Sequence, residues 1–249
     1  MLYIGVGVVV VIFGYLITLL VHHGPQQPFQ KYKLNNLALV ISHPDDEVMF
    51  FAPTLLQLQR TVRNLYVICV TNGGYDGSPV VRQKELLASC VSLGVLRENV
   101  IFMNDTRFVD HPTRSWVVVD LSSRLSALLT KINVDCVLTF GSGGVSGHIN
   151  HIDTHKAVAM LTSHRRLFLG DVNVIRKYSS LIDVVYTYIV NGIVRGQLIF
   201  VSGPRQVFKA LHAMQCHHSQ FVWFRKLYFL FSRYVIVNHL LVVEPSDKT

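Results

Sequence analysis

The chain has 249 residues, of which 50% are hydrophobic and only 15% are charged, which is rich in apolar residues for a purely soluble protein. Its net charge is +8, but the basic residues are dispersed and form no RNA- or DNA-binding motif, so we expect an anionic lipid surface rather than a nucleic acid as partner. Cys69 and Cys136 lie in strand-like apolar runs and Cys90 in a helix-like segment. We therefore expect buried free thiols rather than a small fold held by disulfides.

The segment from Met1 to Val21 contains no charged side chain. At about 1.5 Å per residue, a helix of this length reaches the hydrocarbon thickness of about 30 Å. The alternative is a cleaved signal peptide, but the segment lacks a basic start, is longer than the usual apolar core and precedes no A-x-A-like cleavage site. We expect a transmembrane anchor at residues 1–22, a polar linker at residues 23–36 and a single domain at residues 37–249.

The charges that flank this anchor predict its orientation. Lys31 and Lys33 follow the apolar segment, and no Lys or Arg precedes it. By the positive-inside rule, the domain faces the cytosol. The sequon Asn104-Asp105-Thr106 would carry a glycan if the domain were lumenal, so it can report on this orientation.

After the linker, apolar runs alternate with helix-like segments. The runs with strand character are residues 37–42, 65–71, 100–104, 134–140 and 184–190. The segments with helical length and spacing are residues 47–61, 80–93, 115–132 and 151–165. This alternation predicts an α/β fold, with a Rossmann-like, mostly parallel sheet and helices on both faces. Ligands of such sheets bind beyond the carboxyl ends of the strands.

One imidazole and three carboxylates follow the first predicted strand, in the segment His43-Pro44-Asp45-Asp46-Glu47. Carboxylates next to apolar surface need a cation, hydrogen bonds or water, and a divalent metal ion is the simplest partner. Pro44 keeps His43 out of helical angles, so His43 and Asp46 can turn toward one point as ligands while Asp45 stays beside it as a free base. We expect Glu47 either to support the ligands by a hydrogen bond or to serve as an acid at a helix N-terminus.

A second histidine group, around His148, follows the fourth predicted strand. A glycine-rich loop at residues 140–147 precedes it and allows close approach to a ligand. Catalytic zinc usually takes three protein ligands and water, so we expect His151 to be the third ligand and His148 to serve catalysis. His155, one helical turn after His151, is either a ligand or a partner that supports one. Asn150 stands where H-E-x-x-H requires a glutamate, which argues against a zincin protease.

The two histidine segments resemble the H-P-D-D-E and G-H-x-x-H motifs of the LmbE-like zinc de-N-acetylases. The resemblance covers roughly residues 35–235 and extends to the stretches Phe50-Phe51-Ala52-Pro53, Arg82-Gln83-Lys84-Glu85-Leu86-Leu87, Cys216-His217-His218-Ser219-Gln220 and Trp223-Phe224-Arg225. These stretches are similar to the branch of the family that acts on N-acetylglucosaminyl-phosphatidylinositol in the second step of GPI anchor synthesis. Departures fall mainly at residues 71–79 and 105–116, in loops that we expect to touch the substrate.

The resemblance implies an amide hydrolase at the endoplasmic reticulum membrane that removes the acetyl group from N-acetylglucosaminyl-phosphatidylinositol. It implies zinc, or another divalent metal, held by His43, Asp46 and His151, with Asp45 as general base and His148 polarising or protonating the scissile amide. Two alternatives stay open. One is deacetylation of another N-acetylglucosamine conjugate, and the other is a non-catalytic scaffold subunit of a membrane complex.

Two further predictions concern contact with the substrate and with lipid. Arg82 is expected either to reach the phosphate of the lipid headgroup through its forked guanidinium or to pair with Glu85 on the same helix. Residues 221–234 mix aromatic and basic side chains as interfacial helices do. We therefore expect a membrane-interfacial element within residues 216–244, with a helix packed on the core as the alternative.

Overall fold

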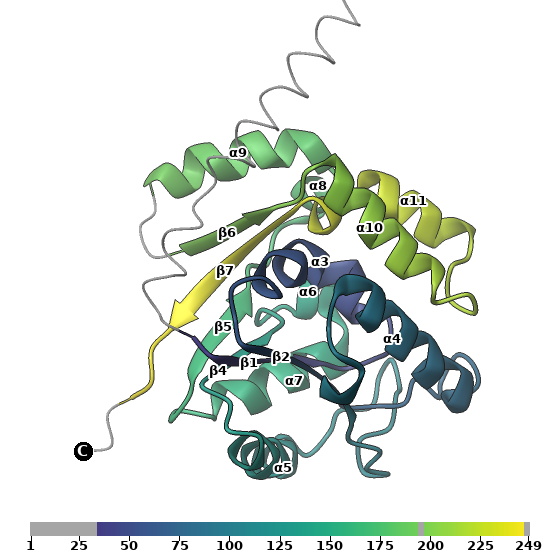
Figure 1. The fold of residues 1–249 in the computed structure, drawn as a ribbon, viewed down its shortest axis with the longest axis vertical. Coiled ribbons are helices and arrows are strands. Elements are labelled where there is room, and N and C mark those ends of the chain that lie inside the picture. The colour runs from purple at the N-terminus through teal and green to yellow at the C-terminus, as the bar shows by residue number, and fades with distance from the viewer. Residues whose placement is uncertain (1–33, 194–196, 247–249) are drawn as a thin grey trace, which may run out of the picture.

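The computed structural model describes residues 34–193 and 197–246 (Figure 1). The transmembrane anchor predicted at residues 1–22, and nearly all of the linker predicted at residues 23–36, lie outside these ranges. Within the described ranges, no helix is long and apolar enough to cross a membrane.

A seven-stranded sheet runs through the molecule. Its strands are β1 (Asn36–Ile41), β2 (Asn64–Cys69), β3 (Val100–Phe102), β4 (Cys136–Thr139), β5 (Arg165–Leu169), β6 (Gln197–Val201) and β7 (Val237–Val243). Their order in the sheet is β3-β2-β1-β4-β5-β7-β6. All neighbours from β3 to β5 pair in parallel, whereas β7 is antiparallel to both β5 and β6. The prediction of a mostly parallel sheet is confirmed.

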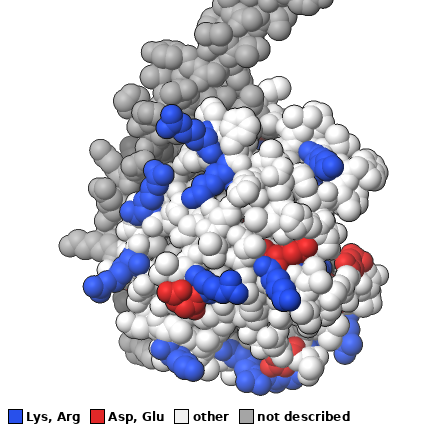
Figure 2. Space-filling model, turned by 45° about the vertical axis from the view of Figure 1, so that its right-hand side comes forward, with Lys and Arg blue, Asp and Glu red and all other residues white. Residues whose placement is uncertain are grey.

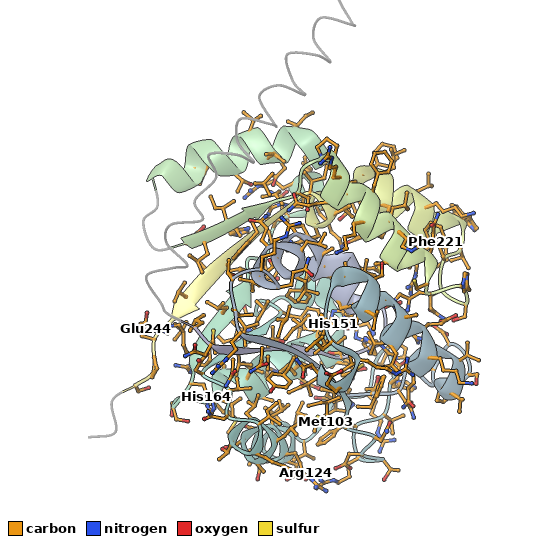
Figure 3. The ribbon with its side chains drawn as sticks, viewed as in Figure 1. Met103, Arg124, His151, His164, Phe221 and Glu244 are labelled. Atoms are coloured by element: carbon orange, nitrogen blue, oxygen red, sulfur yellow. The ribbon has the colours of Figure 1, made fainter. Side chains whose placement is uncertain are left out.

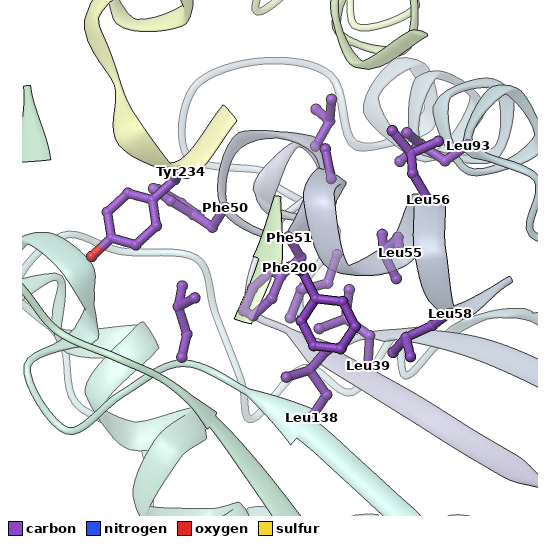
Figure 4. Close-up of a cluster of buried hydrophobic side chains, with 14 of the residues drawn as sticks. Leu39, Phe50, Phe51, Leu55, Leu56, Leu58, Leu93, Leu138, Phe200 and Tyr234 are labelled. Atoms are coloured by element: carbon purple, nitrogen blue, oxygen red, sulfur yellow. The ribbon is translucent and has the colours of Figure 1, made fainter. Parts of the chain in front are cut away.

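The alternation of side chains along the central strand divides the core into two layers. In β1, Leu37, Leu39 and Ile41 belong to one hydrophobic cluster, and Ala38 and Val40 belong to the other. Successive side chains of a strand point to opposite faces, so a fully apolar strand must be covered on both sides. Figure 4 shows part of the first cluster, in which Leu39 and Leu138 from the sheet pack against side chains of the helix α3 (Asp46–Leu58).

Helices cover both faces, as predicted. The first cluster lies beneath α3 (Asp46–Leu58), α4 (Pro79–Leu93) and α10 (Pro204–Gln215), and the second lies against α5 (Val118–Lys131) and α7 (Ile149–Ala159). The remaining helices are α6 (Gly144–Gly147), α8 (Val174–Lys177), α9 (Ser180–Ile193) and α11 (Trp223–Phe231), with 3-10 turns at Arg97–Asn99 and Arg233–Val235. Helices therefore lie on both faces of the sheet, above and below it in Figure 1.

The strand predicted at residues 184–190 is wrong, because these residues belong to α9. A short apolar run is compatible with either a strand or a buried helix. Burial follows a helical period here: Val184 and Thr187 are buried, whereas Ile182 and Tyr186 are exposed. The chain forms its later strands elsewhere, in β5, β6 and β7, and the helix predicted at residues 151–165 ends at Ala159 so that β5 can begin.

The cysteines have the state that the sequence predicts. All four are free thiols, and Cys69, Cys90 and Cys136 are buried. Burial raises the pKa of the Cys69 and Cys90 thiols well above its usual value, so both stay protonated. They pack as small apolar side chains.

The topology brings the two histidine segments together. β1 and β4 are neighbouring parallel strands, so their carboxyl ends open on the same edge of the sheet. The His43 segment follows β1, and the glycine loop with α6 and α7 follows β4. The chain moves from β1 to β2 on one side, while β4 lies on the other side, and open α/β sheets bind ligands at such a change of direction.

Candidate metal centre and active site

Asp46, in the first turn of α3, is fixed by the backbone around it. Its Oδ2 accepts hydrogen bonds from the N–H groups of Ser42 and His43, at 3.2 and 2.8 Å, while Oδ1 faces His151. The preceding residue, Asp45, has φ +115°, in the left-handed region that side chains other than glycine rarely adopt. This strained turn leads the chain from β1 into α3 and separates the directions of the two adjacent carboxylates.

Three side chains from the two segments converge on one point. His43 Nδ1 lies 3.2 Å from His151 Nε2 and 3.5 Å from Asp46 Oδ2, and His151 Nε2 lies 3.2 Å from Asp46 Oδ1. With metal–ligand bonds of about 2.0–2.1 Å, the ligand atoms of a tetrahedral site stand about 3.3–3.4 Å apart. The three residues that the sequence analysis singled out as ligands thus have the spacing of such a site. His151 lies near the middle of the molecule in Figure 3.

In both His43 and His151, the contacts of the ring nitrogen that points away from the centre decide which nitrogen carries a proton. His151 Nδ1 lies 3.1 Å from the carbonyl oxygen of Gly144, to which it can only donate. His43 Nε2 lies 3.2 Å from Asp110 Oδ1 and 3.2 Å from Asn150 Oδ1, and both of these oxygens are acceptors. In the neutral rings, His151 Nε2 and His43 Nδ1 therefore carry lone pairs that face each other. Lone pairs aimed at one point repel unless a cation lies between them, so the donor set fits a metal ion.

The electrostatics of the centre show the same demand for positive charge. Burial opposes a proton on His43, but hydrogen bonds to Asp110 and Asp46 outweigh it and raise the pKa of His43 to about 10. Burial acts to raise the pKa of Asp46, yet attraction to His151 and His43 lowers this pKa well below its usual value. Without a metal ion, a proton takes the central place, so protons and metal ions compete for these ligands.

His148 lies beside the donor centre, where it caps the N-terminus of α7. Its Nδ1 accepts a hydrogen bond from the N–H of Asn150 at 3.2 Å. The ring nitrogens of His43, His148 and His151, one from each, lie within 4.8 Å of one another. This group is looser than the one formed by His43, Asp46 and His151. Burial and repulsion from the other two imidazoles lower the pKa of His148 to about 4. At neutral pH this ring is therefore a neutral Nε2–H donor, which favours the polarising role over the protonating one.

Asp45 is held by two guanidinium groups from different parts of the chain. Arg225 Nη1 forms an ion pair with Asp45 Oδ2, and Arg82 Nη2 lies 3.5 Å from the same oxygen. Arg225 comes from α11, 180 residues further along the sequence. Its sequence context gives no sign of this contact, because a basic residue among aromatic ones is equally typical of a surface. The sequence analysis named Arg225 only within a stretch that resembles the de-N-acetylases and assigned it no role.

Arg82 is buried. Among the residues that the structure describes, its ion-pair partners are Asp45 and Asp110, so the predicted pair with Glu85 does not form. Its guanidinium donates to the carbonyl oxygens of Pro44 and Gly73, at 2.7 and 2.9 Å, and lies 3.6 Å from Asp110 Oδ2. Arg82 therefore ties the turn after β1 to two neighbouring loops. Its contact with a substrate phosphate stays a prediction.

Glu47 has no exposed surface and supports Asp45. Its Oε2 accepts the backbone N–H of Asp45 at 3.0 Å, which stabilises the strained turn. Its Oε1 accepts hydrogen bonds from Ser89 Oγ and from His217 Nε2, the latter at 2.7 Å. Burial opposes a proton on His217, but Glu47 outweighs it and raises the pKa of His217, so the two form a buried ion pair. The sequence analysis did not assign His217 a role, because adjacent histidines also occur by chance in a histidine-rich chain.

His155 lies one helical turn after His151 and is not among the converging donors. Its Nδ1 lies 2.9 Å from the carbonyl oxygen of Phe140. The Phe140 ring in turn stacks on His151, with ring centroids 4.1 Å apart and an interplanar angle of 3°. His155 thus supports a ligand indirectly, through the residue that packs on it, as one of its two predicted roles requires.

Asp110 and Asn150 orient His43 and were not assigned to the site from the sequence. Asp110 belongs to a loop after β3, within residues 105–116, where the sequence departs from the family that it resembles. Asn150 is fully buried; its Oδ1 contacts His43 and also accepts the N–H of His111 at 3.2 Å. A signal for Asn150 was present, since it lies inside the G-H-x-x-H segment, but its orienting role depends on contacts across the fold.

Comparison with known proteins shows the family of the chain. The family model described as PIG-L, GlcNAc-PI de-N-acetylase, matches residues 38–162, which include both histidine segments. The chain belongs to the GlcNAc-PI de-N-acetylase family. The N-acetylglucosaminyl-phosphatidylinositol de-N-acetylase of Bos taurus is 39% identical over 212 residues, which cover 81% of each chain. The probable enzyme of the same name from Schizosaccharomyces pombe is 31% identical over 219 residues, covering 85% of this chain and 88% of that one.

The chain shares its fold with a deacetylase of known structure. The N,N'-diacetylchitobiose deacetylase of Pyrococcus horikoshii superposes with a TM-score of 0.59 at 17% sequence identity, over 93% of this chain and 92% of that one. At this identity the likeness concerns the fold. It supports the α/β architecture derived above from strand order and register.

We predict that His217→Ala lowers the free energy of unfolding by about 3–5 kcal/mol at slightly acidic pH, because it leaves the buried Glu47 carboxylate without its partner. The pKa of His217 is raised above the unfolded value of 6.5, so the contribution of the pair is complete below pH 6.5 and is lost as the pH rises through the raised pKa. Unfolding of the detergent-solubilised chain between about pH 6 and pH 9 measures this difference.

The neighbouring His218 is exposed and provides the matched control, since His218→Ala should leave the stability unchanged. Adding Glu47→Gln to His217→Ala should restore part of the loss, because it removes the stranded charge. A deficit in His217→Ala that grows toward alkaline pH would contradict the assignment of an ion pair.

Proposed function

We propose that this chain hydrolyses the acetamide of N-acetylglucosaminyl-phosphatidylinositol, giving glucosaminyl-phosphatidylinositol and acetate in GPI anchor biosynthesis. The observation that carries the proposal is the convergence of His43, Asp46 and His151 beside the carboxylate of Asp45. It occurs in a chain whose curated relatives bear this activity in their names. An acetamide needs both a strong nucleophile and polarisation of its carbonyl, and this arrangement can supply both.

We infer that the metal is zinc and that His43, Asp46 and His151 would hold it. Two imidazole nitrogens and one carboxylate oxygen form the type of ligand set used by catalytic zinc, and another divalent metal that accepts this set would also fit. When bound, the ion lowers the pKa of a water molecule and polarises the carbonyl group of the acetamide. Asp110, Asn150 and the carbonyl of Gly144 keep the two imidazoles in the tautomers that present lone pairs.

Asp45 serves as the general base in this proposal. Arg225 and Arg82 both contact Oδ2, which orients the carboxylate and leaves Oδ1 as the atom that accepts a proton from the attacking water. Glu47 holds the backbone N–H of Asp45 and with it the position of this side chain. The proton that Asp45 takes from water can then be passed to the departing amine.

His148 is the proposed hydrogen-bond donor to the acetamide oxygen. With Nδ1 occupied by the N–H of Asn150, its Nε2–H can donate to that oxygen as negative charge develops on it. The low pKa of His148 keeps the ring neutral at neutral pH. A neutral donor next to the metal ligands also avoids placing a further positive charge beside the ion.

We propose in addition that residues 1–22 hold the chain at the endoplasmic reticulum membrane, with residues 37–249 in the cytosol. Three features support this: the uncharged apolar segment Met1 to Val21, the residues Lys31 and Lys33 after it, and the lipid tail of the proposed substrate. The membrane and the glycolipid are then the partners of the protein.

The proposed reaction is tested by acetate release from N-acetylglucosaminyl-phosphatidylinositol. We expect the detergent-solubilised chain to release acetate, to lose this activity on chelation and to regain it when zinc is added back, because a bound metal ion would activate the attacking water. Turnover of a different N-acetylglucosamine conjugate, but not of the lipid, would replace the substrate. Bound zinc without turnover on any of these substrates would favour a scaffold.

Variants of the proposed base and of a proposed ligand should separate loss of turnover from loss of bound zinc. Asp45→Asn should lower kcat by about 10²–10⁴-fold while stoichiometric zinc is retained, because a general base contributes about this much. His151→Ala should instead lose zinc, measured by metal analysis after dialysis, and His155→Ala is its control one turn along the same helix. Loss of zinc in Asp45→Asn, or full zinc occupancy in His151→Ala, would contradict this division of roles.

The orientation is tested by glycosylation of Asn104. This side chain is exposed on the described surface, so a lumenal domain would offer the sequon to the transferase. We expect no glycan on Asn104 when the chain is expressed in eukaryotic cells, measured by the mobility shift on glycosidase treatment. A sequon in an added N-terminal extension should be modified and serves as the positive control. A glycan on Asn104 would reverse the proposed orientation.

A further inference from the structure

The helix α11 is amphipathic with its apolar side turned outward. Trp223, Phe224, Leu227, Leu230 and Phe231 are between 48 and 72% exposed. Their spacing of i, i+1, i+4, i+7 and i+8 places them on one face of the helix. In a surface helix of a soluble protein, such a face normally points toward the core, so this orientation indicates that something covers it.

The outward face continues onto α8 and α9, which lie with α11 along the upper edge of the molecule in Figure 1. Tyr178, after α8, contacts Tyr228 of α11 with ring centroids 6.5 Å apart, which joins the two elements. Eleven of the 23 exposed large apolar side chains in the described ranges lie in these segments. We call them the outward apolar face: Val174, Ile175, Tyr178, Ile182, Tyr186, Val222, Trp223, Phe224, Leu227, Leu230 and Phe231.

The charge of this region is one-sided. The 60 residues from Val184 to Val243 contain six Lys or Arg and no Asp or Glu. Arg225 and Arg233 pair inward with Asp45 and Asp183, whereas Arg205 and Lys209 of α10 and Lys226 beside the apolar stripe of α11 are exposed. The Arg176 guanidinium pairs with Asp183 and lies 4.3 Å from the centroid of the Tyr186 ring. The face drawn in Figure 2 has basic side chains spread among uncharged ones, with a few acidic ones in its lower half. Aromatic and aliphatic side chains flanked by cations are the composition of interfacial helices.

We propose that the outward apolar face docks on an anionic phospholipid bilayer, as a second membrane contact beside the anchor proposed above. The apolar side chains enter the boundary between headgroups and acyl chains, and the flanking cations meet lipid phosphates. This inference rests on the proposed function only in the choice of a lipid-linked substrate. The composition and exposure of the face stand independently of it.

A second copy of the chain fits this face less well than a bilayer does. In a two-fold contact the face would meet itself, which brings cations of one copy toward cations of the other. The stretch from Val184 to Val243 has no carboxylate to pair with them. Like charges placed together across an interface cost free energy, whereas anionic lipids supply the missing negative charge.

The docked face lies directly over the active site. Arg225, on the inner side of α11, forms the ion pair with Asp45, and the Tyr228 hydroxyl donates to the carbonyl oxygen of Met49 in α3 at 3.0 Å. One helix, about 10–12 Å thick, therefore separates the face from Asp45. In N-acetylglucosaminyl-phosphatidylinositol the acetamide is carried by a sugar that stands off from the lipid phosphate. Docking of this face would therefore place Asp45 about one helix thickness from the bilayer surface, on the side of the lipid phosphate where the sugar stands.

The contact is tested by the fluorescence of Trp223, one of only two tryptophans in the chain. The full chain is reconstituted into phosphatidylcholine vesicles that contain phosphatidylinositol, and it is compared with Trp223→Phe, which keeps the face apolar. The difference between the two signals belongs to Trp223, because Trp116 is buried. We expect this signal to be quenched by lipids brominated near the headgroup end of the acyl chain and to be protected from iodide in the water.

Three results are distinguishable, and each decides the proposal. Quenching by bromolipid supports it. Free access of iodide without quenching by bromolipid would overturn it, because the face would then be in water. Protection from both quenchers would also overturn it, because protein would then cover the face. None of these readings requires turnover, so failure of the proposed reaction cannot be mistaken for failure of the docking.

A kinetic comparison adds a functional readout. Leu227→Glu/Leu230→Glu should lower turnover of the lipid substrate in vesicles by about tenfold or more, because charges would be forced into the interface, and should leave turnover of its deacylated, water-soluble analogue unchanged. Val117→Glu/Val119→Glu is the matched control, since these side chains are 64 and 62% exposed at the start of α5, on the other side of the sheet. Equal losses on both substrates would assign α11 a structural role and would contradict the docking.

Discussion

Asp45, Asp46 and Glu47 are three consecutive carboxylates that are 4, 3 and 0% exposed, and a carboxylate buried without a positive partner costs several kcal/mol. Each has a different partner. Asp46 faces two imidazoles and the place of a metal ion, Asp45 meets two guanidinium groups, and Glu47 pairs with an imidazole behind the site. The separation works because the strained backbone of Asp45 and the first turn of α3 send adjacent side chains in different directions.

The need to neutralise these charges organises the C-terminal part of the chain. His217, just after α10, and Arg225, on α11, both reach back to the first turn of α3. The contacts bring α11 over Asp45, with Arg225 on its inner side and exposed apolar side chains on its outer side. One short helix thus links the candidate general base to the surface that we propose for the membrane, and a chemical requirement of catalysis sets the orientation in which lipid can be met.

Several features were predictable from local sequence because they rest on local physics. The run Leu37 to Ile41 is apolar at every position, which is how a central parallel strand reads, and the acidic segment that follows it marks a strand end. The strand predicted at residues 184–190 was wrong because short apolar segments are compatible with both a strand and a buried helix. In the helix α9 that these residues form, Asp183 is buried and pairs with Arg176 and Arg233. No local pattern reveals these contacts.

The α/β class, the free thiols and the three side chains that converge as ligands follow from the sequence, because periodicity, burial and short motifs encode them. Which other groups act on these ligands follows from tertiary contacts alone. Asp110, Asn150, His217 and Arg225 reach the site across the fold, and neither spacing nor composition encodes which distant side chain will balance a buried charge. The tautomers of His43 and His151, and the neutral state of His148, depend on those same contacts, because a proton is placed by the atoms around it.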